Sequence, residues 1–410
     1  MRNYASYADH ANLGINEPED IFSAHHYTAV RDGGRQMRAL PLWCYTSEQF
    51  HRAEMEKVFL PSWNLLDREE IVPNIGDFRC VTFMGANLLV ARGKDDNVRV
   101  FANTCPHRGA LVAQDSGNCK VFKCPYHFWT FGLDGHLIGA PDYKGPDGED
   151  LINPSNREEY GLAEIESGCW GGFIFVRLKQ GRETLEQHLG AFVENFASHK
   201  LKDMRRARKV VFEMEANWKC FVENYIDAQH IPFVHKDSLA QWKADDYRRV
   251  EPRGQESLTL AVHEGSQLLL PKDDYKGFPA MAQIDAGKKR GTFFSTLRPG
   301  FMMTMGNDGA LVFQCDPISA TKSRLTVSSL FPKSYFERDD FEQLAENYYR
   351  RNSIVVGEDK AIAERQFAGI QSPFARIARL CTNETSLNVF ANWIVDQVVG
   401  PDNQEAIAAE

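Results

Sequence analysis

The chain has 410 residues, 43% of them apolar and 25% charged, and carries a formal net charge of −9. This length exceeds the size at which a single hydrophobic core keeps growing, so two domains are expected, and the ordinary composition argues against disorder. The acidic balance leaves no broad basic surface for nucleic acid or anionic membranes. No apolar run is long enough to span a membrane, and the first thirty residues lack the pattern of a signal peptide, so we expect a cytoplasmic protein.

The first part of the chain, up to about residue 38, is polar and mixed, and we expect an arm there. Its adjacent His25 and His26 are assigned no role, because histidines in a polar tail are usually solvated. The run TSEQFHRAEMEKVF then predicts a helix that begins after Ser47 as N-cap and ends before Pro61. Residues 70–103 alternate in short apolar runs broken by turn residues, which predicts a small antiparallel sheet.

Two short loops follow, and each carries one cysteine and one histidine. The first holds Cys105 and His107, and the second holds Cys124 and His127. Four such ligands can bind one tetrahedral zinc ion or a two-iron two-sulfur cluster. Zinc fingers usually pair cysteine with cysteine and histidine with histidine, so mixed pairs favour a cluster with two different irons. A structural zinc site and four unrelated residues are the alternatives. The nine cysteines are odd in number and scattered, which predicts reduced thiols rather than disulfides.

The rest of the chain predicts a hairpin after the second loop, a closing strand over 171–178, and then a change of character. Residues 183–198 and 218–231 are expected to be helical, several strands follow up to residue 332, and a long helix is expected over 339–366. We therefore predict a domain over 40–180 that holds the two loops. Residues 181–410, together with the arm 1–39, form a second domain in which a large antiparallel sheet encloses the long helix.

A second metal site is predicted in the run from Glu223 to His235. Asp227 and His230 are three residues apart and share a helix face, whereas His235 lies about 140° further round unless Pro232 interrupts the helix. Two histidines and one carboxylate are the ligands of mononuclear non-haem iron oxygenases. The carboxylate must come from elsewhere in the chain, and the candidates are Asp359 and the adjacent Glu358.

With these motifs the chain resembles the Rieske non-haem iron oxygenases, in particular the alpha (large) subunit of the aromatic ring-hydroxylating dioxygenases, over nearly its whole length. The resemblance implies an α+β protein in which a Rieske domain, a small antiparallel β sandwich, is inserted in a helix-grip (START-like) catalytic domain. It implies a Rieske 2Fe-2S cluster and a mononuclear Fe(II), and it selects Asp359 over Glu358 as the ligand beside His230 and His235. It also implies a homotrimer, with or without a β subunit, in which Asp227 accepts a hydrogen bond from His127 of the partner subunit.

Asp227 and Asn224 are the predicted catalytic residues. Asp227 is placed to hold the outer ring nitrogen of His230, although an ordinary surface aspartate is the alternative. No dinucleotide-binding motif is present, so electrons must come from a separate NAD(P)H reductase, with or without a ferredoxin. The first hypothesis is hydroxylation, with dihydroxylation as its favoured form, of a small carboxylated aromatic substrate.

The alternative is a monooxygenase or demethylase that acts on N-methyl, O-methyl or quaternary ammonium groups. An electron carrier without catalysis would leave residues 181–410 without a purpose, and a zinc-stabilised binding module would be colourless. The apolar pocket walls are expected among Phe301, Met302, Met303, Met305 and Phe313. Arg298 is considered as a partner for a substrate carboxylate, although a structural or solvated arginine is the more common case.

Overall fold

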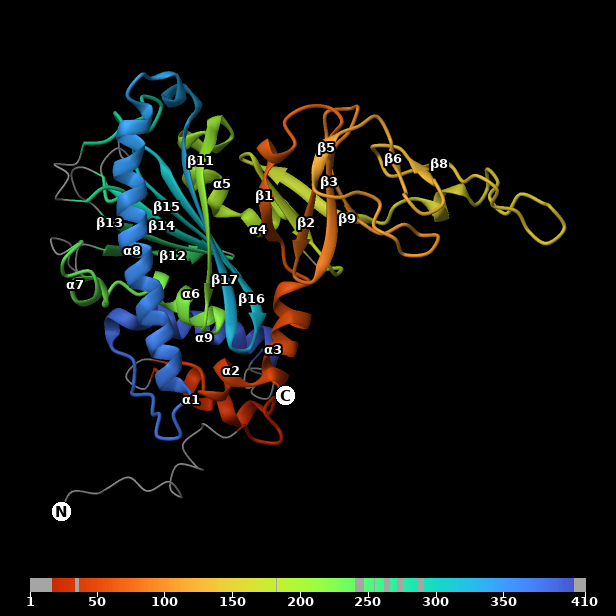
Figure 1. Ribbon diagram of the computed structural model, residues 1–410. Coiled ribbons are helices and arrows are strands. Elements are labelled where there is room, and N and C mark those ends of the chain that lie inside the picture. The colour runs from red at the N-terminus through yellow and green to blue at the C-terminus, as the bar shows by residue number, and fades with distance from the viewer. Residues whose placement is uncertain are drawn as a thin grey trace, which may run out of the picture. The chain divides into compact units, whose positions relative to one another are not determined.

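The computed structural model describes residues 17–33, 37–181, 183–239, 247–253, 255–261, 266–270, 276–285 and 291–401 (Figure 1). Contacts divide the chain into two units, which we call the inserted unit, Ser62–Leu185, and the main unit, formed by Met1–Pro61 and Glu186–Glu410. The boundaries predicted from the sequence are residues 40 and 181. Residues 43–59 lie with the main unit because helix α3 (Glu48–Glu54) and the π-helical turn after it contact helix α9 (Thr385–Val398).

The inserted unit consists of two antiparallel sheets. A seven-stranded sheet has the order β1-β10-β9-β4-β3-β2-β5, and a three-stranded sheet has the order β6-β7-β8. The predicted hairpin after the second loop is present as β7 and β8. The strands are β1 (Asn64–Arg68), β2 (Asp77–Phe83), β3 (Ala86–Arg92), β4 (Val98–Ala102), β5 (Ser116–Asn118), β6 (Phe122–Lys123), β7 (Thr130–Phe131), β8 (Leu137–Gly139), β9 (Glu164–Trp170) and β10 (Phe173–Arg177).

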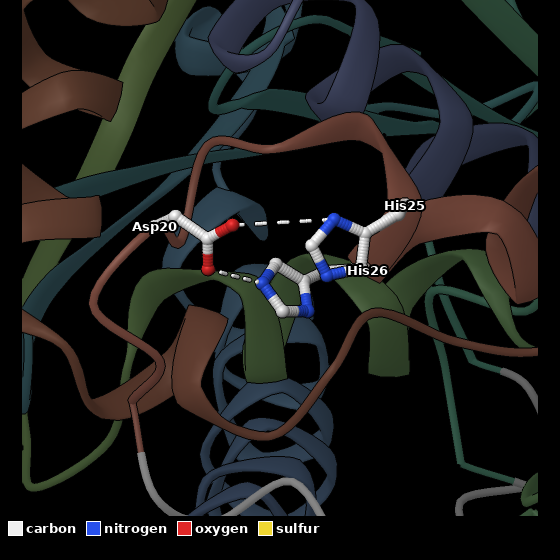
Figure 2. Close-up of side chains that lie close together, drawn as sticks. All are labelled: Asp20, His25 and His26. Atoms are coloured by element: carbon white, nitrogen blue, oxygen red, sulfur yellow. Dashed lines mark hydrogen bonds and ion pairs between the residues drawn. The ribbon is translucent and has the colours of Figure 1, made fainter.

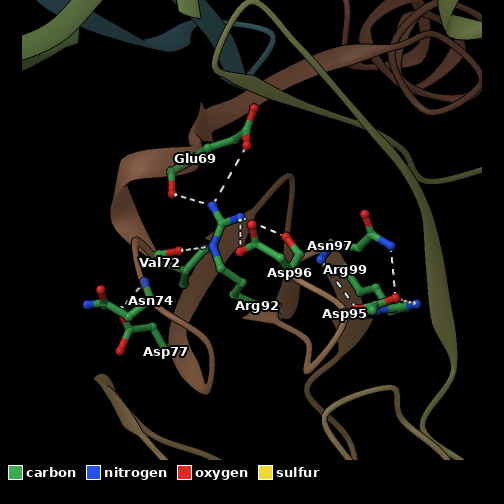
Figure 3. Close-up of polar contacts among 9 residues, drawn as sticks. All are labelled: Glu69, Val72, Asn74, Asp77, Arg92, Asp95, Asp96, Asn97 and Arg99. Atoms are coloured by element: carbon green, nitrogen blue, oxygen red, sulfur yellow. Dashed lines mark hydrogen bonds and ion pairs between the residues drawn. The ribbon is translucent and has the colours of Figure 1, made fainter. Parts of the chain in front are cut away.

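The turns of this sheet are closed by charged side chains (Figure 3). The guanidinium of Arg92 is nearly buried and donates from Nε to the carbonyl oxygen of Val72 at 2.6 Å and from Nη1 to that of Asp96 at 2.8 Å. In the β3–β4 turn, Arg99 donates to both carboxylate oxygens of Asp95 at 2.9 and 2.7 Å. The Arg92 bonds satisfy nearly buried polar groups, and the more exposed Arg99–Asp95 pair adds a second link within the hairpin that leads into the first loop.

The main unit is built on a seven-stranded antiparallel sheet of order β11-β17-β16-β15-β14-β13-β12. Helix α8 (Phe341–Ile370) runs along one face of this sheet (Figure 1) and contacts β11. The predicted α+β class, with an inserted antiparallel unit, is confirmed. The strands are β11 (Met204–Met214), β12 (Tyr247–Arg253), β13 (Glu256–Ala261), β14 (Thr292–Leu297), β15 (Phe301–Met305), β16 (Ala310–Ser319) and β17 (Lys322–Pro332).

The helices of the main unit follow the predictions with one important difference. Ser47 is the N-cap of α3 as predicted, since its hydroxyl accepts from the backbone N–H of Phe50 at 3.0 Å. The helix predicted over 218–231 ends early, as α6 (Trp218–Ile226), and a separate turn, α7 (Ile231–Val234), follows. The remaining helices are α1 (Thr28–Arg31), α2 (Trp43–Thr46), α4 (Leu185–Leu189) and α5 (Ala191–Phe196).

Short 3-10 turns complete the secondary structure. The helix predicted over residues 183–198 is divided into α4, α5 and the 3-10 turn Ala197–His199. None of the described helices combines the length and the apolar character needed to cross a membrane. These turns are Ala24–Tyr27, Glu69–Ile71, Arg157–Tyr160, Ala197–His199, Leu201–Asp203, Lys333–Glu337 and Thr382–Glu384, and the π-helical turn is Met55–Phe59.

A buried ion pair joins helix α6 to helix α3. Lys219 donates from Nζ to Glu54 at 2.6 Å, and both side chains are fully buried. The indole N–H of Trp218 donates to the second oxygen of Glu54 at 3.2 Å, and the hydroxyl of Tyr45 donates to Glu223 at 2.6 Å. Because a buried charge is tolerated only when it is paired, these contacts fix the position of α6 in the core.

Candidate active site

The two loops of the inserted unit share one backbone design. The N–H groups of Gly109 and Phe128, each four residues after the cysteine of its loop, donate to the carbonyl oxygens of Cys105 and Cys124 at 2.8 and 3.0 Å. Both residues have positive φ, +76° for the glycine and +56° for the phenylalanine. In each loop the cysteine N–H donates to the carbonyl oxygen five residues later at 2.8 Å. Each loop is therefore a closed turn that fixes its cysteine independently of distant segments.

The side chains of these loops fit a two-iron cluster. Cys105 and Cys124 are buried and unoxidised, and the rings of His107 and His127 lie 4.6 Å apart between centroids. Burial, with the neighbouring His127, lowers the pKa of His107 and favours the neutral imidazole that a metal requires. The Nδ1 atoms of both rings are buried and have no hydrogen-bond partner in the described structure. Such atoms are expected to bind a metal, because an unpaired buried nitrogen is otherwise costly.

The same geometry argues against a single zinc ion. A tetrahedral ion would hold its donors roughly 3.5 Å apart. Within the described residues, no three donors from these loops lie within 4.8 Å of one another. His107 stacks on Trp129 at 4.8 Å, whereas Tyr126 and Phe128 beside the second loop are 51% and 57% exposed. The second loop therefore presents its histidine at an exposed aromatic edge of the unit.

The main unit gathers the second predicted ligand set. His230 and His235 flank α7, and α8 supplies Asp359. The Nε2 atoms of His230 and His235 lie 3.5 and 3.0 Å from Oδ1 of Asp359, and donor atoms of all three residues lie within 4.8 Å of one another. Oδ1 of Asp359 has no hydrogen-bond partner among the described residues. The three side chains can hold one metal ion with open positions, and the donor set suits non-haem iron.

A carboxylate lies behind each histidine of this set. Oδ2 of Asp227 is 3.4 Å from Nδ1 of His230, and Oε2 of Glu358 is 2.7 Å from Nδ1 of His235. The same Glu358 oxygen accepts from the hydroxyl of Ser238 at 2.6 Å. Glu358, weighed in the sequence as a metal ligand, thus contacts the outer nitrogen of a histidine instead. Both rings are oriented with Nε2 toward Asp359.

The break after α6 positions Asp227 and has a local cause. The Asp227 carboxylate accepts from the backbone N–H of Gln229 at 2.7 Å, so this side chain competes with the helical pattern and ends it. The sequence placed the interruption at Pro232, which instead lies in the first turn of α7. Pro fits that position because the first N–H groups of a helix have no intrahelical partner.

The charges of this site favour a cation. Three carboxylates face two imidazoles. Burial lowers the pKa of His230, but the neighbouring carboxylates of Asp227 and Asp359 outweigh it and raise that pKa to about 9. Despite burial, the two histidines hold the pKa of Asp359 well below its usual range. The excess of negative charge would stabilise a divalent ion.

A cavity opens onto these ligands, and its walls differ from those predicted. Three aromatic rings contribute to it. Tyr225 lies 6.3 Å from Phe294 and 5.4 Å from Phe313, and its hydroxyl is 3.0 Å from that of Thr304. Of the residues suggested as pocket walls, Phe313 lines the cavity and the others do not. They are Phe301, Met302, Met303 and Met305.

Arg298 has the structural role that was favoured over pairing with a substrate carboxylate. Arg298 lies over the ring of Trp393 and donates to the carbonyl oxygen of Gln255 at 3.2 Å, and it does not line this cavity. Arg351 does line it, and is 5% exposed. Arg351 precedes Asp359 by eight residues on α8, with Val355 between them, and all three line the cavity. That four-residue spacing was a readable signal.

Family comparisons match both units. Residues 62–152 match the model of the Rieske [2Fe-2S] domain, and residues 201–400 match that of the ring hydroxylating alpha subunit (catalytic domain). The chloroplastic choline monooxygenase of Spinacia oleracea is 26% identical over 390 residues, which cover 93% of this chain and 83% of that protein. The carnitine monooxygenase oxygenase subunit of Acinetobacter baumannii is 32% identical over 206 residues, covering 50% of this chain and 54% of the relative.

Solved structures share the fold. A quaternary ammonium Rieske monooxygenase, described with carnitine oxidation and inter-subunit electron transfer, superposes with a TM-score of 0.72 at 24% identity. The match covers 88% of this chain and 95% of that one. At this identity the likeness establishes the common architecture of the two chains.

Proposed function

Because the chain belongs to the Rieske non-haem iron oxygenases, we propose that it is a monooxygenase that oxidises a small quaternary ammonium compound. Relatives named for choline and carnitine support this over the aromatic hydroxylation first expected from the sequence. The observation that carries the proposal is the aromatic wall formed by Tyr225, Phe294 and Phe313 beside the candidate iron ligands. Aromatic faces attract a quaternary ammonium group by cation–π interaction.

We assign the cluster to Cys105, Cys124, His107 and His127, and the mononuclear iron to His230, His235 and Asp359. When bound, the cluster would supply electrons one at a time and the iron would supply the reduction of dioxygen. Glu358 holds the outer nitrogen of His235 by a hydrogen bond, and the Asp227 carboxylate lies 3.4 Å from that of His230, so both carboxylates favour the observed ring orientations. Asn224 lines the cavity beside these ligands and is proposed to contact the reacting groups.

Arg351 narrows the substrate class. Arg351 lines the same cavity as the aromatic rings, and its guanidinium is always charged. A substrate with a carboxylate at one end and a trimethylammonium group at the other would place each charge against a complementary wall. We therefore propose a small betaine-like zwitterion rather than an uncharged or purely cationic amine.

The proposed reaction inserts one oxygen atom into a C–H bond beside the ammonium nitrogen. Dioxygen, two electrons and two protons convert the C–H group to C–OH and one water molecule. The resulting carbinol at a carbon bonded to positive nitrogen loses that C–N bond, which gives an aldehyde and a protonated tertiary amine. Oxygenases of this family take electrons from reductase or ferredoxin partners, and we propose an NAD(P)H reductase here.

The path between the two metal centres is a further part of the proposal. The sequence resemblance suggests a trimer in which the cluster of one subunit serves the iron of its neighbour. A solved relative is described with inter-subunit electron transfer, which supports this arrangement. Asp227, which already contacts His230, would join the centres by accepting a hydrogen bond from His127 of the partner subunit.

The experiment is a turnover assay of the iron-loaded protein with a chemical reductant and labelled oxygen gas. Carnitine, glycine betaine, choline and salicylate are offered separately, and amine, aldehyde and hydroxylated products are identified by mass. We expect a singly labelled product and a released tertiary amine from a betaine. Ring hydroxylation of salicylate with no reaction of the three ammonium compounds would overturn the proposal.

A matched variant tests the zwitterion separately. Arg351→Gln should raise KM for a betaine roughly tenfold or more, because the variant loses the contact between Arg351 and the substrate carboxylate. KM for choline, which has no carboxylate, should stay within about twofold. The control is Arg350→Gln, one position away on α8 and facing outward. Equal effects of Arg351→Gln on both substrates would remove the carboxylate assignment and leave the monooxygenase assignment in place.

A further inference from the structure

The beginning of the described chain gathers three side chains that can ligate a metal, far in sequence from both iron sites. Figure 2 shows the rings of His25 and His26 turned toward the carboxylate of Asp20. Nε2 of His26 is 2.8 Å from Oδ1 of Asp20, and Nδ1 of His25 is 4.0 Å from Oδ2. Donor atoms of all three residues lie within 4.8 Å of one another.

The adjacent histidines converge because they use different ring nitrogens. Their ring centroids are 3.8 Å apart, and one ring presents Nδ1 while its neighbour presents Nε2. His26 also packs edge-on against Trp43 at 5.6 Å, which limits the positions its ring can take. The hydroxyl of Ser23 lies 2.8 Å from Nδ1 of His25, the same atom that faces the carboxylate, so a bound ion would replace this hydrogen bond.

The backbone that carries these side chains is already folded into a tight turn. The N–H of Ser23 donates to the carbonyl oxygen of Asp20 at 2.8 Å, and the N–H of His26 donates to that of Ser23 at 3.2 Å. The buried hydroxyl of Tyr27 donates to the carbonyl oxygen of Ile21 at 2.5 Å. A ligand would therefore meet donors held in place rather than a chain that has to be ordered first.

We propose that Asp20, His25 and His26 form a third metal site, which binds one divalent late transition metal ion such as Zn²⁺. Two imidazoles and a carboxylate are a zinc donor set. A tetrahedral ion with bonds of about 2.1 Å holds its donors roughly 3.4 Å apart, between the two distances measured here. The His25 and Asp20 side chains are 64% and 60% exposed, so water completes the coordination and the ion exchanges with solvent.

A bound ion would cross-link the turn that carries these three residues and so stabilise the folded conformation of this segment. The next residues are docked on the C-terminal helix, where Arg31 donates to Asp396 at 2.5 Å and to the carbonyl oxygen of Gly400 at 2.8 Å. Asn388 of α9 donates to the carbonyl oxygen of Val30 at 2.9 Å. An ion that joins Asp20 to His26 closes the turn just before this docked segment and slows its opening.

Calorimetric titration with Zn²⁺ tests the proposal on the full protein with cluster and iron loaded, and iron is counted before and after. We expect one Zn²⁺ per chain without release of iron. Affinity should fall at least tenfold in His25→Ala and in Asp20→Asn, both at exposed positions where folding is not at risk. Hydrogen exchange of residues 17–33 should slow on adding Zn²⁺ in the wild type only.

His136→Ala provides the control, because His136 is also an exposed histidine hydrogen-bonded to an aspartate, Asp134, and its pair is not among the three-donor groups of the described residues. That variant should bind Zn²⁺ as the wild type does. The proposal is overturned if the wild type binds no Zn²⁺ apart from ions that displace iron. It is also overturned if His25→Ala and Asp20→Asn retain the wild-type affinity.

Discussion

The two proposed iron sites of this chain are built in opposite ways. The cluster loops span residues 105–129, and each closes on itself through backbone hydrogen bonds within six residues. The other site joins a broken helix to α8, with more than a hundred residues between His235 and Asp359. The first kind of site depends on turn chemistry, and the second depends on the packing of a whole unit.

The largest predicted effects separate the two sites completely. Cys124→Ser should remove the visible absorption of the cluster but leave one iron per chain bound, because the second site is in another unit. Asp359→Ala should do the reverse, losing that iron and keeping the cluster. Iron counting with electron paramagnetic resonance of the reduced protein checks both variants. Loss of both centres in either variant would show that the sites are not built independently.

The next largest effect is a loss of stability of the main unit when the buried Lys219–Glu54 ion pair is broken. Glu54→Gln leaves Lys219 charged and unpaired behind α6, which should lower the free energy of unfolding by roughly 3–5 kcal/mol. Urea unfolding followed by fluorescence should show this loss, while the cluster absorption keeps its own midpoint. Glu56→Gln, an exposed neighbour, is the control and should stay within about 0.5 kcal/mol. A small effect of Glu54→Gln would mean that the buried pair does not hold the helix.

The pH dependence of stability should report on the same region. Burial raises the pKa of Glu223 to about 7 from an ordinary value of 4.5. Between these values the folded state holds a proton that the unfolded state has released, so stability falls as pH rises through this window and levels off above it. Glu223→Gln should therefore gain stability relative to the wild type between pH 5 and 8, by up to about 3 kcal/mol. A difference that does not change with pH would contradict this assignment.

A smaller effect, on iron affinity, is expected from Glu358, which contacts the outer ring nitrogen of His235. Glu358→Ala should weaken iron binding about 10- to 100-fold by removing the hydrogen bond to the outer ring nitrogen, without affecting the cluster. Glu364→Ala lies further along α8, where its carboxylate pairs with Lys360 instead. Iron affinity measured by competition with a chelator should distinguish the two variants. Equal affinity in both would mean that Glu358 has no part in positioning the ligand.

The smallest prediction concerns the cluster loops alone. Gly109 has φ of +76° and open space where a Cβ would lie, so Gly109→Ala should cost only the backbone strain, about 1 kcal/mol. Gly139→Ala also has open space but no positive φ, and should be close to neutral. The thermal midpoint of cluster loss measures both. A neutral Gly109→Ala would show that the loop tolerates another backbone conformation.

The sequence predicted the cluster loops better than the mononuclear iron site, because turn chemistry is local in sequence and the packing of a whole unit is not. Cysteine, histidine, proline and glycine at fixed spacing specify a closed loop, so the cluster motif could be read directly. The end of α6 could not, because the Asp227 side chain breaks the helix by bonding to the N–H of Gln229. The aromatic pocket walls depend on which strand faces turn toward α6 and α8, which the sequence pattern does not specify, whereas Arg351 lies at four-residue spacing from Val355 and Asp359 and could have been found. The roles of individual ligands stay predictions.

The claim that two separately built centres act as one oxygenase is tested most directly at Asp227. Asp227→Asn with cluster and iron both loaded is chemically reduced and then mixed with oxygen and a betaine, and cluster oxidation is followed by stopped-flow absorbance. The wild type should reoxidise its cluster and form product in one turnover, whereas the variant should keep its cluster reduced and form almost none. Wild-type rates and yield in Asp227→Asn would contradict the account.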